Sequence, residues 1–216
     1  MRSIKLLGAF AAVSVLAGCA THGEVSIPVK SAVENPQFEN KIFSSEVFYA
    51  QPKPGIFSGG EMLELKPIEN AELSVGASRV LARFKELFAR QLPLSTKISS
   101  VGEADFDLVT ELTAHDKSGP AYADFDAAIT FGKDIITLGL GASEYTIRAD
   151  FDVTYRLQDK SGKTVYEKSF KVEDSIDHER GQFDSFDIGE DLAAKLFEKH
   201  VVLTMNDFFT EASQVM

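Results

Sequence analysis

Three Asp-Phe-Asp triplets are the first feature of the sequence that could do chemistry. They begin at Asp105, Asp124 and Asp150. Two carboxylates two residues apart could bind a hard cation such as Ca²⁺, which takes six to eight oxygen ligands. In a half-buried strand, however, residues i and i+2 both face solvent while the central residue enters the core. We prefer this second interpretation, and we expect no metal site at these triplets.

The four histidines offer little support for a catalytic centre. They stand at positions 22, 115, 178 and 200, and no two of them have the i, i+4 spacing of a helical zinc site. We expect His200 to be a partly buried structural residue of the last helix. The sequence also lacks a Gly-x-Ser-x-Gly nucleophile motif and a glycine-rich phosphate loop. A hydrolase would need two carboxylates that converge in a cleft, and the sequence does not identify such a pair.

The single cysteine follows a short basic and apolar N-terminal segment. Arg2 and Lys5 precede an almost unbroken apolar run over residues 6–16, which is shorter than the ~20 residues needed to span a bilayer. This pattern predicts a secretory signal peptide. The run ends in Leu16, Ala17, Gly18 and Cys19.

These four residues resemble the lipobox of bacterial lipoproteins at every position. The resemblance implies that residues 1–18 are removed as a signal peptide and that Cys19 carries diacylglyceryl and N-acyl lipid. Because Cys19 is the single cysteine, its lipidation would leave no thiol nucleophile in the chain. We expect no cofactor other than this lipid. Several long acyl chains would anchor the protein stably to a membrane, since each buried methylene contributes ~0.8 kcal/mol. The residue after the cysteine is Ala20; the absence of Asp there points to the outer membrane, with the protein facing the periplasm.

The net charge argues against nucleic acid as a partner. The chain carries 22 basic and 33 acidic side chains, a net charge of −11. Removal of residues 1–18 would also remove Arg2 and Lys5 and lower the charge to −13. Such a protein would be repelled by phosphate backbones and by anionic lipid, so we expect its attachment to depend on the acyl chains.

The remaining sequence predicts a tether and one domain. A length of 216 residues with 44% hydrophobic residues suits a single globular core. Residues 19–40 contain Gly23, Pro28 and Pro36 with little periodicity, so we expect a lipidated tether. Residues 41–216 then form one periplasmic domain.

The periodicity of the domain predicts an α+β fold. Strands are expected where apolar residues alternate, at 42–50, 105–112, 145–158 and 166–176, and amphipathic helices at 74–92 and 188–212. The last two strands flank the turn at 159–163 and form a long antiparallel hairpin. Asp187 and Glu190 occupy capping-box positions before the second helix. We therefore expect two layers, a mainly antiparallel sheet with its long β-hairpin packed against two amphipathic helices.

Two segments are candidates for a binding role in addition to a structural one. The 51–60 loop holds two prolines and three glycines, with Ile56 and Phe57 between them and Gly59 and Gly60 after them. These apolar side chains either project outward as a docking point or fold back onto the sheet. The glycine-rich apolar segment 129–142 is a flap over a lipid-sized groove, an insertion that pairs with a partner, an ordinary core loop, or a core or edge strand; we favour the strand.

The order of elements resembles small envelope lipoproteins of Gram-negative bacteria, including auxiliary and assembly-type outer-membrane lipoproteins. The similarity covers residues 74–212 and includes the hairpin turn at Asp159-Lys160-Ser161-Gly162-Lys163. It implies a non-enzymatic accessory protein that binds another envelope protein during assembly or transport. A lipid or glycolipid binder with an apolar groove is the alternative, and an envelope hydrolase is the third possibility.

Overall fold

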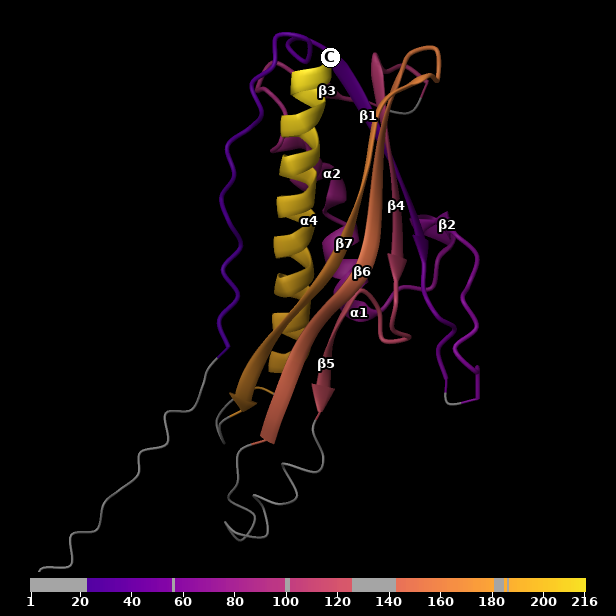
Figure 1. Cartoon of the computed structure of the whole chain (residues 1–216), viewed down its shortest axis with the longest axis vertical. Helices are drawn as coiled ribbons and strands as arrows, with labels where there is room; N and C mark the ends of the chain where they lie inside the picture. The colour runs from indigo at the N-terminus through magenta and orange to yellow at the C-terminus, as the bar shows by residue number, and fades with distance from the viewer. Residues whose placement is uncertain (1–22, 56, 100–101, 126–142, 181–184, 186) are drawn as a thin grey trace, which may run out of the picture.

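The computed structural model describes residues 23–55, 57–99, 102–125, 143–180, 185 and 187–216. Within these residues, three α-helices cover one face of an open, mixed, seven-stranded sheet (Figure 1). The predicted two-layer α+β fold is confirmed. The strands are β1 (Ile42–Ala50), β2 (Lys66–Pro67), β3 (Lys97–Ile98), β4 (Phe106–Ala114), β5 (Ala121–Phe125), β6 (Ser143–Asp159) and β7 (Thr164–Arg180). The helices are α1 (Val75–Leu81), α2 (Phe84–Ala89) and α4 (Ile188–Val215), with a short 3₁₀ turn at Ile68–Asn70.

Strand β6 is the centre of the sheet. On one side it pairs antiparallel with β7 over almost its whole length. On the other side it pairs with β4 and then with β5, so these two strands are halves of one long strand interrupted by residues 115–120. Strand β1 runs parallel to β4 and extends the sheet to β2 and β3. The sheet is therefore mainly antiparallel, with parallel pairing confined to β1.

The β6–β7 hairpin follows the predicted alternation. Every second residue of β6 from Ile147 to Leu157 is at most 1% exposed, and these residues face the helices. At the tip, Asp159 Oδ1 accepts hydrogen bonds from the N–H groups of Ser161 (2.8 Å) and Lys163 (3.1 Å). Gly162 has a φ of 80°, which favours glycine. Leu157 pairs with Tyr166 whereas Gln158 pairs with Thr164, so a β-bulge shifts the register by one residue between the turn and the rest of the hairpin.

The first helix of the sequence prediction is broken. Residues 77–92 contain no Gly or Pro, and their apolar spacing predicted one helix over 74–92. In the structure α1 ends at Leu81 and α2 begins at Phe84, because the N–H of Arg83 bonds to Val80 O, three residues back, at 3.0 Å. Both halves still bury their apolar stripe.

Helix α4 spans the length of the helix layer and begins without the predicted capping box. The side chain of Asp187 caps no backbone N–H, and the Asp187 N–H is itself bonded to Ser185 Oγ at 3.3 Å. The helix is instead held by packing, since twelve of its residues are buried. A hydrogen bond of 3.0 Å between Tyr155 Oη and Thr204 Oγ1 ties it to β6 in the interior.

The described part of the predicted tether lies against the domain. From Gly23 the chain runs along α4 and turns into β1 at the far end (Figure 1). The Val33 N–H bonds to Gln91 O at 2.8 Å, and Asn206 Nδ2 donates to Ser31 O at 3.2 Å. Phe38 is completely buried and packs edge-on against Phe209. Residues 23–40 of the predicted tether thus pack against the domain, because their few apolar side chains complete the core.

Candidate functional site

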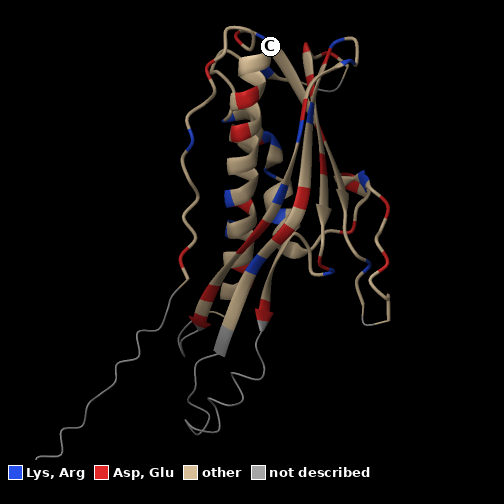
Figure 2. Ribbon diagram, viewed as in Figure 1, with Lys and Arg blue, Asp and Glu red and all other residues tan. Residues whose placement is uncertain are grey.

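The described chain begins at the end of the molecule where β7 finishes and α4 starts. The N–H of Gly23 donates to Nδ1 of His178, which is 4% exposed, over 3.1 Å. Leu16, Ala17, Gly18 and Cys19 lie outside the described residues. The ends of β5 and β7 at this pole carry acidic side chains, among them Asp124 and Asp177 (Figure 2).

Residues 51–65 form a loop with an ordered base between β1 and β2; we call it the 51–65 loop. The Lys53 N–H bonds to Glu61 O at 2.7 Å, and the Leu63 N–H bonds to Gln51 O at 2.9 Å. The buried side chain of Gln51 is itself held, since Tyr49 Oη donates to its Oε1 at 2.8 Å. These bonds fix the direction in which the loop leaves the sheet (Figure 1).

The 51–65 loop exposes apolar side chains. Phe57 is 100% exposed, so its side chain projects outward and does not fold back onto the sheet. This is one of the two orientations that the sequence left open. Gly59 and Gly60 follow it with φ values of 62° and 74°, a conformation that disfavours other residues. Met62 (48%) and Leu65 (40%) add exposed apolar surface that the sequence analysis did not single out. Ile56 lies outside the described residues, as does segment 129–142.

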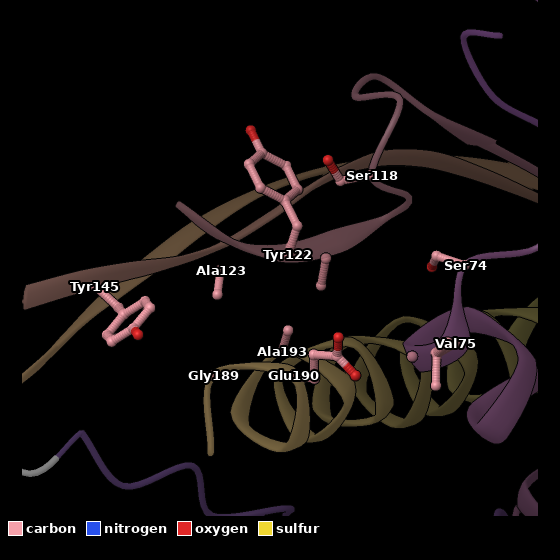
Figure 3. A pocket seen from close by; sticks show the side chains of 11 residues that line it. Ser74, Val75, Ser118, Tyr122, Ala123, Tyr145, Gly189, Glu190 and Ala193 are labelled. Carbon is pink, nitrogen blue, oxygen red and sulfur yellow. The ribbon is translucent and has the colours of Figure 1, made fainter. Parts of the chain in front are cut away.

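A cleft of about 350 Å³ lies between β5 and the first turns of α1 and α4. Ala123 and Tyr145 point from the sheet toward α4, and Ala193 faces them from the helix (Figure 3). The rim is polar, with Ser74, Ser118 and Glu190. The apolar floor could hold a hydrocarbon group.

The Asp-Phe-Asp triplet in β6 shows the predicted strand geometry, and the triplet at β4 shows it only in part, because Asp105 precedes that strand. Phe151 is fully buried, while Asp150 and Asp152 face the opposite side of β6. Phe106 is half-buried against Phe38 and Phe43, and Asp105 Oδ2 accepts a hydrogen bond from the Ile42 N–H at 3.0 Å. The third triplet is described only in part: Asp124 is exposed and pairs with Arg148 at 3.4 Å.

The structure adds an ionic contact that sequence reasoning missed. His115 Nδ1 lies 2.6 Å from Asp150 Oδ1, and its Nε2 lies 3.2 Å from Asp152 Oδ2. Burial alone would lower the pKa of His115, but hydrogen bonds and charge attraction from the two carboxylates outweigh it and raise the pKa. The ring thus bridges the two carboxylates of the Asp150-Phe151-Asp152 triplet, at the start of the 115–120 interruption.

A second ionic cluster joins the edge strand β7 to α4. Asp174 Oδ2 lies 2.9 Å from Lys199 Nζ and 2.8 Å from His200 Nε2. Burial would raise the pKa of Asp174, yet hydrogen bonds from Lys199 and His200 lower it. His200 is therefore the structural residue that its position predicted. Over the described residues, no group of three or more His, Cys, Asp and Glu side chains is arranged to hold a metal ion.

Comparisons with known proteins give similar structures but no family. No family model matches the chain, and no curated protein matches its sequence. A homologue of a neuraminyllactose-binding hemagglutinin from Helicobacter pylori is similar at 8% identity and a TM-score of 0.42, covering 89% of this chain and 100% of that one. A Xanthomonas campestris protein of family DUF330 has 10% identity, a TM-score of 0.39 and coverage of 88% and 95%. A minor lipoprotein from Acinetobacter baumannii has 11% identity, a TM-score of 0.37 and coverage of 80% and 94%.

These likenesses concern the general course of the chain, since all three TM-scores are below 0.5. None of the described helices combines the length and the apolar character that crossing a bilayer requires.

Proposed function

We propose that this protein is a lipid-anchored accessory lipoprotein of the bacterial outer membrane, facing the periplasm, that binds another envelope protein through the 51–65 loop. The anchor is inferred from the four lipobox-like residues ending at Cys19. The binding role is carried by one observation, the fully exposed Phe57 on a loop whose base is hydrogen-bonded. Exposed aromatic side chains held in a fixed position are typical anchors of protein interfaces.

The anchor would fix which end of the molecule meets the membrane. Cys19 precedes Gly23 by four residues, a reach of at most about 14 Å. The hydrogen bond between Gly23 and His178 places that start at the end of β7. The acidic side chains at this pole would be repelled by anionic lipid, so the attachment would depend on the acyl chains.

Cys19→Ser tests the anchor. The variant should fold, because residue 19 precedes the described domain, and it should move from the membrane fraction to the soluble periplasmic fraction. Retention of the variant in membranes would overturn the lipid anchor. Separation of inner and outer membranes with the wild-type chain tests the location.

Co-purification from detergent-solubilised membranes tests the binding role. Phe57→Ser should reduce recovery of a specific envelope protein at least tenfold. Leu94→Ser is the matched control, since Leu94 is also fully exposed (103%) but lies next to β3. Equal recovery with both variants would contradict a docking role for the 51–65 loop.

A lipid or glycolipid ligand is the second candidate, because the β5–α4 cleft has an apolar floor at the same pole as Gly23. Its test is mass spectrometry of the purified Cys19→Ser chain, which carries no lipid of its own. Co-purified lipid that is displaced by Ala193→Phe would support it, and absence of lipid would exclude it.

A further inference from the structure

The outer edge of β1 is paired at both ends and open in the middle. Strand β3 pairs with it at Ile42 and Phe43, and β2 pairs with it at Phe48 and Tyr49. On this side, no described strand pairs with residues 44–47. At roughly 3.3 Å per residue the gap is about 13 Å long.

The backbone groups at the gap point outward. Alternate residues of a strand direct their N–H and C=O groups to opposite neighbours. The carbonyls of Phe43 and Gln51 face the outer edge, since they accept hydrogen bonds from Ser99 N (2.8 Å) and Leu63 N (2.9 Å). By the same alternation, the N–H and C=O groups of Ser45 and Val47 also face this edge. These are the groups that an added strand would pair with.

A cleft of about 430 Å³ lies beside the gap. Its walls include the apolar residues Ile68, Leu81 and Phe84, and the break between α1 and α2 at Ala82 borders it. Ser45 also lines the cleft, and its buried Oγ has no hydrogen-bond partner in the part of the chain that the structure describes. A buried hydroxyl is normally satisfied, so a polar group of an added segment would supply the partner that the described residues do not.

We propose that residues 44–47 of β1 are a strand-addition site for an extended polypeptide segment of the partner protein. The proposal rests on the proposed function and specifies how the partner is held. A polypeptide backbone has the donors and acceptors that match Ser45 and Val47, whereas an acyl chain would leave them unpaired.

The surroundings agree with a short extended segment. Alternate side chains of an added strand point to the same face, so one apolar side chain would enter the cleft against Leu81 and Phe84. Glu69 and Lys85, which also line the cleft, are of opposite charge and favour neither an acidic nor a basic segment. The 51–65 loop leaves from the end of β1 and returns through β2, so both surfaces can contact one partner (Figure 1).

Photo-crosslinking in native membranes tests the site. Benzoylphenylalanine replaces exposed Ala82 at the cleft, exposed Ala89 on α2 outside it, or Phe57 in the loop. We expect Ala82 to form a discrete adduct that maps to one short segment of the protein captured from position 57, with at least tenfold less product from Ala89. A lipid adduct alone at Ala82, or no adduct there while position 57 still captures its partner, overturns strand addition and leaves the proposed function standing. Absence of adducts from both position 57 and position 82 contradicts the strand-addition site and the proposed function.

Variants at the edge distinguish backbone pairing from simple proximity. Val47→Pro removes an outward N–H without removing a bond to β4, so the Ala82 adduct should fall at least tenfold. Ser45→Ala keeps the backbone groups and should retain most of the adduct. The Ser45 and Val47 amides should also exchange at least tenfold more slowly in membranes than in the purified chain.

An unchanged adduct in Val47→Pro, or equal amide exchange in both states, overturns the proposal. If Val47→Pro fails to fold, Ala82→Trp tests the same point by filling the cleft, with Ala89→Trp as its control. Capture from position 57 should then fall at least tenfold with Ala82→Trp only, and equal capture in both variants contradicts strand addition.

Discussion

The backbone N–H of Gly23 donates a hydrogen bond to the ring nitrogen Nδ1 of His178, 155 residues later in the chain. The contact is close, since a Cβ added to Gly23 would lie 2.9 Å from the carbonyl oxygen of Asp177. It brings the segment that follows Cys19 to the end of β7. The lipidated end and the domain would therefore be joined by at most a few residues.

Gly23→Ala should destabilise this junction. The new methyl group would displace the segment from β7, and the free energy of unfolding should fall by about 1 kcal/mol. For a domain of this size that corresponds to a fall in Tm of about 2–4 °C in calorimetry. Gly76→Ala is the control, because its added Cβ meets nothing nearer than 3.8 Å. Equal Tm values for Gly23→Ala and the wild type would show that the junction contributes no stability.

Phe38→Ala should destabilise the domain far more than a change in a mobile tether could. Phe38 is fully buried and makes edge-on contacts with Phe43 and Phe209. Loss of a large core side chain costs about 3–5 kcal/mol, which urea unfolding would measure. Val29→Ala in the same segment is the control, since Val29 is fully exposed. A cost below about 0.5 kcal/mol for Phe38→Ala would mean that residues 23–40 are not part of the folded core.

The His115 contact predicts a pH-dependent contribution to stability. Its pKa in the folded protein is raised above 6.5, so folding favours the protonated ring. The contribution is full below about pH 6.5 and is lost as the pH rises through the folded value. Unfolding free energies of the wild type and His115→Gln should therefore converge as the pH rises above 6.5 and through the raised folded pKa of His115. NMR titration of the ring gives the pKa directly, and a value at or below 6.5 would contradict the prediction.

Much of the sheet could be predicted from the sequence, because strands with one face exposed to solvent alternate polar and apolar residues. Residues 145–158 alternate without interruption, and the structure buries every second one from Ile147 to Leu157. The turn at Asp159 and Gly162 is set by local hydrogen bonds and a positive φ. These features depend on residues close in sequence.

Of the features that the sequence did not predict, the helix break has no local sequence marker and the others depend on distant contacts. No residue type marks the break at Arg83, and the neighbouring apolar spacing is regular on both sides. The burial of Phe38 depends on Phe209, which lies more than 150 residues away. His115 meets Asp150 and Asp152 only because β4 and β6 pair in one register. The open gap in β1 likewise follows from where β2 and β3 begin and end.

Among the residues singled out in the sequence, Phe57 gives the strongest support for the proposed function, because its side chain is exposed. The sequence left outward and inward orientations open, because prolines and glycines define a loop without defining the direction of its side chains. In the structure, the side chain of Phe57 is exposed, and hydrogen bonds hold the base of the 51–65 loop. Met62 and Leu65 extend the exposed apolar surface, although no periodic pattern marks them.

Comparison of photo-crosslinks from positions 57 and 94 in intact membranes tests the central claim most directly. Both positions carry fully exposed apolar side chains, so they differ in location and not in accessibility. With benzoylphenylalanine at each position in turn, the proposed function predicts one discrete protein adduct from position 57 and at least tenfold less from position 94. Equal adduct patterns from the two positions, or lipid adducts alone from position 57, would contradict it.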